Sequence, residues 1–205
     1  MSDDAAQVAE DDSSPMEGAD LLAIHEAGHA VVALALGLRI VAVSITDATG
    51  TADFAPLRPK VIHGKPTTRL LRALDIYGQI CLAGPTAELW SDPNAFNLED
   101  YDWPDTGGDV EPWAQDVTEV MRLSAKLGTP DWFRAMARKT RERVEQHWSA
   151  IETVADALLR QGTLAEDELL TLVGDELGVK RKNGPLGRRA PSPHRGEGRG
   201  EGVTA

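Results

Sequence analysis

The stretch LLAIHEAGHAVV, from Leu21 to Val32, decides how this chain folds and where its chemistry lies. Its residues favour a helix, and His25 and His29 stand four positions apart, so both imidazoles share one helical face. With Glu26 beside the first histidine they form the HExxH pattern, in which the histidines bind zinc and the glutamate acts as general base. The stretch therefore predicts a site for one Zn²⁺ ion per chain, with His25 and His29 as ligands.

The surroundings of this motif favour a metal over a structural role. A buried histidine is more often a hydrogen-bonded core residue than a ligand. Here, however, apolar residues surround the motif, and burying two imidazoles and a carboxylate without partners would cost several kcal/mol. A metal would supply the missing partner. Since zinc lowers the pKa of a bound water towards neutrality, the pattern favours hydrolysis of an amide bond.

Length and charge predict one domain between two tails. With 205 residues, of which 41% are hydrophobic, the chain can bury one core. The net charge of −12 is spread unevenly: the first 20 residues hold seven acidic residues and no basic one, whereas Lys180 to Ala205 hold seven Lys and Arg. We expect a disordered acidic tail over 1–18, a zinc-binding domain over 19–176, and a disordered basic tail over 177–205 that contacts nucleic acid at most weakly.

The composition also excludes several classes of protein. The single cysteine, Cys81, excludes an internal disulfide and is expected only to pack. The first residues lack the basic and apolar regions of a signal peptide, which makes a cytoplasmic location the expectation. No uninterrupted apolar run reaches about 18 residues, so we expect no membrane span. We see no glycine loop that would cradle phosphates, and therefore expect no nucleotide site.

Apolar periodicity predicts a mainly α-helical fold with a small β-sheet or hairpin. A peptide could add as a further strand to the edge of this sheet. The expected elements are a helix over 19–36 closed by Gly37, strands over 39–46 and 51–55, a helix from about 66 to 90, a helix beginning near 109, a helical pattern from 129 to 162, and a last short helix capped by Thr163 and Glu166.

The motif alone leaves one metal ligand to be found. A catalytic zinc usually takes three protein ligands and a water. No histidine follows the motif at the spacing of an extended zinc motif, and surface or packing roles suffice for His63 and His147. A downstream carboxylate is therefore needed, and the candidates are Glu88, Asp102, Asp105, Asp109 and Asp116.

Four runs of sequence together resemble a known family. They are HEAGHAVV (25–32), LAGPTAELW (82–90), DTGGDV (105–110) and HWSAIETVADALLRQGTLAEDEL (147–169). Their order and spacing are similar to those of the zincin-like peptidase domain of the FtsH family, which reads HEAGHA, then a GGRxAEE-like run, then a TGAxND-like run. The resemblance covers about residues 19–174, with the HEAGH core as its most specific part.

The resemblance implies roles for two further residues. Asp109 matches the aspartate of the third run and would be the third zinc ligand, and Glu88 matches the first glutamate of the second run and would orient the metal histidines. The chain departs from the family pattern at Gly108, which replaces an asparagine, and at Pro85, which replaces a basic residue. The family also joins this domain to membrane helices and an AAA ATPase module, for which we expect no room here.

These observations together predict a stand-alone zinc metalloendopeptidase. Its substrates would be unfolded or flexible protein segments, and Glu26 would be its general base. The alternatives are a catalytically silent, zinc-bound interaction module and a peptidase subunit that depends on a separate AAA ATPase partner. The resemblance also makes a homo-oligomeric ring conceivable.

Overall fold

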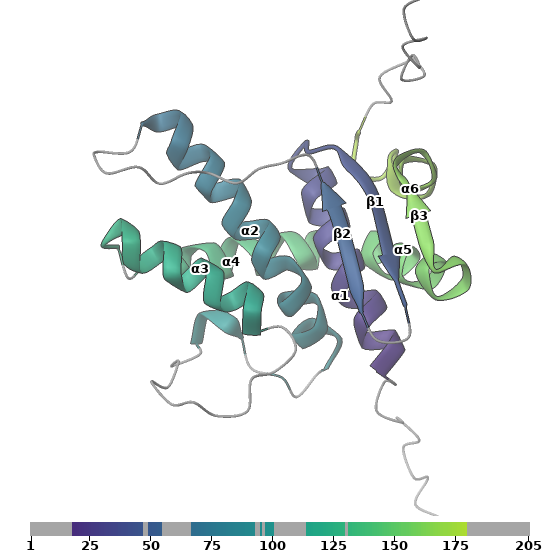
Figure 1. Ribbon diagram of the computed structural model, residues 1–205, viewed down its shortest axis with the longest axis horizontal. Helices are drawn as coiled ribbons and strands as arrows, with labels where there is room; N and C mark the ends of the chain where they lie inside the picture. Colours follow the sequence, from purple (N-terminus) through teal and green to yellow (C-terminus); the bar gives the residue numbers. More distant parts are fainter. Residues whose placement is uncertain are drawn as a thin grey trace, which may run out of the picture.

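The computed structural model describes residues 18–46, 49–54, 67–92, 95, 97–100, 114–129 and 131–179. Helices dominate these residues, and three short strands form one antiparallel sheet, so the expected coarse fold class is confirmed. Figure 1 shows the sheet lying over helix α1, with α2, α3 and α4 to one side and α5 and α6 to the other. Most of residues 1–18 and 177–205 lies outside the described part, so the two expected tails stay predictions.

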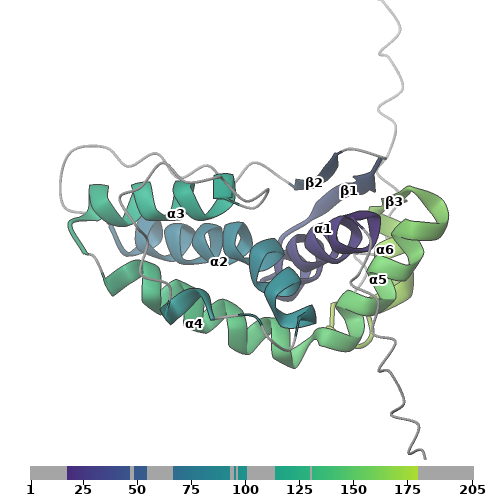
Figure 2. The same cartoon turned by 90° about the horizontal axis from the view of Figure 1, so that it is seen from below.

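Helix α1, Gly18–Ala35, is the central element of the fold. Every residue from Ala23 to Leu34 is buried, which is typical of a helix enclosed on all sides rather than of a surface helix. It packs against α2, α5 and the sheet, as Figure 2 shows from below. Gly37 ends the helix at a φ of 79°, a conformation that glycine adopts without strain.

The sheet has the strand order β2-β1-β3. Strands β1, Ile40–Ile45, and β2, Gly50–Phe54, pair antiparallel as expected from the alternating pattern. The third strand, β3, Thr163–Ala165, was not expected: it pairs with the other edge of β1, where Leu164 lies opposite Val43. A three-residue strand has no periodicity of its own, and only its partner makes it a strand.

Helix α2, Thr68–Ser91, follows the expected bounds closely. The hydroxyl of Thr67 accepts a hydrogen bond from the backbone N–H of Leu70 and so caps its first turn. The helix continues through Pro85, although proline removes one backbone hydrogen bond. Burial of residues 78–87 keeps this part of the helix in place.

The C-terminal half differs from the sequence prediction in two places. The helical pattern from 129 to 162 forms two helices, α4, Asp131–Gln146, and α5, Trp148–Gln161, that meet at His147. The expected cap of Thr163 on the last helix is wrong, because Thr163 belongs to β3. Helix α6 is Glu166–Val173, and its N-cap residue is Ala165. The backbone N–H of Ala165 donates a hydrogen bond to the carboxylate of Glu168 at 2.8 Å.

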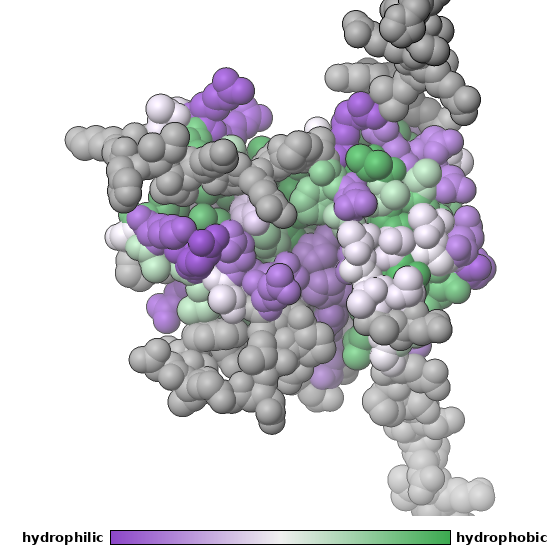
Figure 3. Space-filling model, in the orientation of Figure 1, coloured by the Kyte–Doolittle hydropathy of each residue, from purple (hydrophilic) through white to green (hydrophobic). Residues whose placement is uncertain are grey.

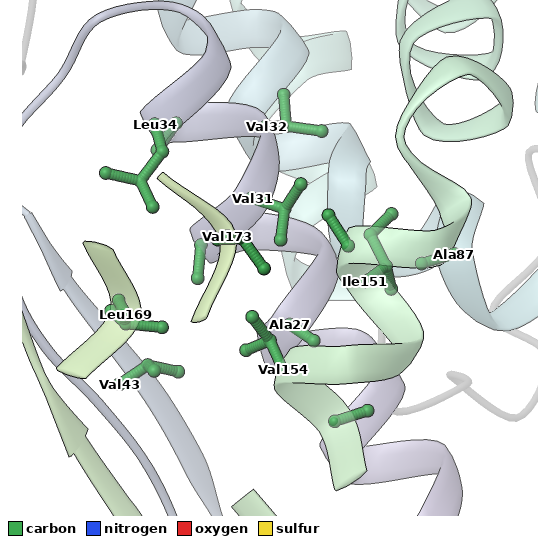
Figure 4. Packing of buried hydrophobic residues seen from close by; sticks show 14 of the residues in the cluster. Ala27, Val31, Val32, Leu34, Val43, Ala87, Ile151, Val154, Leu169 and Val173 are labelled. Carbon is green, nitrogen blue, oxygen red and sulfur yellow. The ribbon is translucent and has the colours of Figure 1, made fainter. Parts of the chain in front are cut away.

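Two hydrophobic clusters hold the elements together. The larger joins α1, one face of α2, the sheet, α5 and α6, with Val31, Val43 and Ile151 fully buried (Figure 4). The smaller packs the opposite face of α2 against the 3₁₀ turn η1, Leu98–Asp100, helix α3, Ala114–Leu127, and α4. The described part of α3 begins at residue 114, and its expected start near 109 lies outside that part. No helix among the described residues is both long and apolar enough to cross a membrane.

Candidate metal centre

The two motif histidines point their Nε2 atoms at each other from one face of α1. These nitrogens lie 2.9 Å apart, a separation that the four-residue spacing on one helical face permits. Oδ2 of Asp116, in the first turn of α3, lies 3.4 Å from Nε2 of His25 and 3.6 Å from Nε2 of His29. Within the described residues, this is the group of three side chains that could hold a metal ion.

The other nitrogen of each imidazole has its own partner on α2. Nδ1 of His25 lies 2.6 Å from Oε1 of Glu88, and Nδ1 of His29 lies 2.7 Å from the carbonyl oxygen of Ile80. A carboxylate and a carbonyl both accept, so both Nδ1 atoms donate. A neutral imidazole that donates from Nδ1 presents a lone pair at Nε2, which is the arrangement that second partners of metal histidines enforce.

One stripe of α2 serves both histidines. Ile80, Gly84 and Glu88 follow one another at four-residue spacing and so share one face of the helix. A Cβ atom at Gly84 would lie 2.5 Å from Nε2 of His29 and 2.6 Å from Nε2 of His25. The missing side chain therefore leaves a space beside the Nε2 atoms of both histidines.

These residues fit a zinc ion. Tetrahedral coordination with Zn–N distances of about 2.0–2.1 Å separates two ligand atoms by roughly 3.3 Å. The three separations here are 2.9, 3.4 and 3.6 Å. Two histidines and one carboxylate are a donor set of catalytic zinc sites, in which the fourth position stays open.

The close contacts of His25 with two carboxylates shift the pKa values of His25 and Asp116. Burial lowers the pKa of His25, but hydrogen bonds to Asp116 and Glu88 and the charges of both carboxylates outweigh burial and raise it to about 9. Burial alone would raise the pKa of Asp116, yet its hydrogen bonds to His25 and His29 hold it well below its usual range. The two carboxylates therefore favour the protonated form of His25.

Glu26 lies in the wall of the same cleft, which has a volume of about 490 Å³. Its side chain is buried, and this burial raises its pKa, although the nearby histidines lower it. Four elements line the cleft: α1, β2, α2 and α3. Figure 3 shows hydrophilic surface gathered between the sheet and α3 in this region. A smaller cavity of about 240 Å³, beside the end of α2 and η1, contains none of these site residues.

Comparison with known proteins does not assign this chain to a family. No protein-family model matches the chain, and a search of curated proteins finds no match. The resemblance to the FtsH peptidase domain therefore rests on the motif runs alone.

The structure brings four residues of the sequence prediction, His25, Glu26, His29 and Glu88, together in one cleft. Of the acidic candidates within the described residues, Asp116 lies at the Nε2 atoms of both histidines, whereas Glu88 contacts Nδ1 of His25. Asp109, the residue that the resemblance favoured, lies outside the described residues and stays a prediction. The same holds for Asp102, Asp105 and His63, while His147 does not line the cleft.

Two glycines that no sequence motif marked, Gly50 and Gly84, contact the site residues. Cys81, expected only to pack, is buried in the smaller cluster, and burial raises the pKa of its thiol to about 12. Its sulfur is therefore a neutral thiol at physiological pH, although Cys81 also contributes to the cleft wall.

Proposed function

We propose that this chain is a zinc-dependent endopeptidase that cleaves unfolded or flexible protein segments. The observation that carries the proposal is the convergence of His25, His29 and Asp116 on one point, with Glu26 in the same cleft. His25, His29 and Asp116 would hold the metal, and when bound, zinc supplies Lewis acidity at the fourth position.

Residues of the chain itself would orient the two imidazoles and transfer the proton. Glu88 and the carbonyl of Ile80 hold the two imidazoles in the tautomer that presents Nε2. The carboxylate of Glu26 takes the proton from the attacking water and later gives it to the nitrogen of the leaving amine. Its place in the wall of the cleft that also contains His25, His29 and Asp116 supports this role.

The edge of the sheet suggests how a substrate is held. Strand β2 has β1 on one side, and among the described residues no strand pairs with its other side. Thr51, Ala52 and Phe54 of this strand line the cleft beside the metal ligands. An extended peptide can add to such an edge through main-chain hydrogen bonds. Folded proteins rarely offer a free extended segment, which supports unfolded substrates.

Digestion of casein by the zinc-loaded protein tests this proposal. The matched control is Glu26→Gln with equal zinc content, since this change keeps the size of the side chain and removes its basicity. Cleavage by the wild type alone is the expected result. If neither protein cleaves casein although both hold zinc, an autonomous peptidase is ruled out. An interaction module or a subunit that needs an ATPase partner would then explain the site better.

A further inference from the structure

Gly50, the first residue of β2, lies directly against the side chain of Glu26. A Cβ atom at this position would come within 3.0 Å of Cγ, Cδ and Oε1 of Glu26, which real Cβ atoms essentially never do. These are the three nearest atoms to it, and none belongs to a metal ligand. The edge strand can pass this close to the glutamate only because residue 50 has no side chain.

The backbone at Gly50 is held from several sides. Gly50 pairs with Ile45 at the end of the β1–β2 ladder. The N–H of Thr46 donates to the carbonyl of Thr49 at 2.8 Å, and the N–H of Thr49 donates to the hydroxyl of Thr46 at 3.1 Å. On the other side of β1, the N–H of Ile45 donates to the carbonyl of Gly162 at 2.8 Å.

The side chain of Glu26 is held much less firmly. Its carbon chain has rotatable bonds, and the cleft beside it offers open space. A side chain at residue 50 would therefore displace the glutamate rather than the strand. The displaced carboxylate would leave the position from which it reaches the scissile bond.

We propose that Gly50 is a positioning residue that keeps the Glu26 carboxylate at its working place beneath the substrate-binding strand. This inference rests on the proposed peptidase function. Gly50 would affect the position of the general base, Glu26, and would not affect the metal ligands. Gly50 is thus the point at which the strand that would bind substrate contacts the side chain of the general base.

A double-mutant cycle on thermal stability tests the contact without any need for activity. Glu26→Ala removes all three atoms that a Cβ at residue 50 would meet. Gly50→Ala should lower the melting temperature of the wild type by at least about 2 °C but leave that of Glu26→Ala unchanged. Equal losses in both backgrounds would overturn the proposal. If Gly50→Ala alone fails to fold while the double variant folds, the coupling is present at its largest.

Kinetics and zinc affinity test the positioning role. Gly50→Ala should lower kcat at least about tenfold with an unchanged KM and unchanged zinc affinity, because a displaced base loses part of its catalytic contribution. A raised KM with unchanged kcat would show that the strand moved instead, and would overturn the proposal, as would wild-type values of both.

Gly18→Ala is the matched control for these measurements, since a Cβ there would have no atom within 4 Å. An inactive wild type would refute the proposed function, while the stability cycle would still decide whether Gly50 and Glu26 are coupled.

Discussion

Oδ2 of Asp116 lies 3.4 Å from Nε2 of His25, although Asp116 is on α3, His25 is on α1, and the whole of α2 lies between them in the sequence. The contact depends on α3, whose residues Val117 and Val120 are fully buried in the cluster beneath it. Burying each valine contributes about 1.5 kcal/mol or more, which anchors the first turn of α3 over the histidines.

Replacing Asp116 by alanine should lower zinc affinity by more than about 100-fold, because loss of a ligand exceeds the 10- to 100-fold effect of losing an orienting partner. Competition with a chelator of known affinity measures this. Glu119→Ala is the control: Glu119 lies on the same helix, pairs with Arg122 and should leave affinity unchanged. A larger loss in Asp109→Ala than in Asp116→Ala would assign the third ligand to Asp109.

Glu88 should act through His25 rather than at the metal itself. Glu88→Ala removes the acceptor for Nδ1 of His25 and should lower zinc affinity by about 10- to 100-fold. Glu88→Gln keeps a neutral oxygen that can accept, so its loss should be smaller. The same chelator competition compares the two variants. Equal losses would show that the charge of Glu88, and not its hydrogen bond, supports binding.

A side chain at Gly84 should block the metal while leaving the helix intact. Its Cβ would lie beside Nε2 of both histidines. Alanine favours a helix interior by about 1 kcal/mol over glycine, so α2 itself should not be weakened. We expect Gly84→Ala to lose zinc, measured by elemental analysis after dialysis, with an unchanged far-ultraviolet circular dichroism spectrum. Retention of stoichiometric zinc would show that the space beside Gly84 is not needed for binding.

Zinc binding should release a proton from His25. In the metal-free protein the pKa of His25 is raised to about 9, so this residue is protonated at pH 7.5 and must lose its proton to bind zinc. Affinity should therefore rise with pH up to about 9 and level off above it. Isothermal titration calorimetry in buffers of different ionisation enthalpy counts the released protons, and no dependence on the buffer at pH 7.5 would contradict the raised pKa.

The sequence by itself determined the local part of the site. The four-residue spacing of His25 and His29 fixes one helical face, and the helix that carries them follows from apolar residues next to one another in the chain. The same local periodicity predicted α2, β1 and β2 within about two residues of their observed bounds, because these patterns concern near neighbours only.

Only the tertiary structure decided what comes from distant parts of the chain. Composition did not choose among the acidic candidates, and of those in the described residues the docking of α3 through its buried valines brought Asp116 to the histidines. Strand β3 exists because the free edge of β1 pairs with it. Gly50 and Gly84 matter because side chains of helix α1 lie directly against them, and a sequence does not show which side chain will lie against the backbone of a distant element.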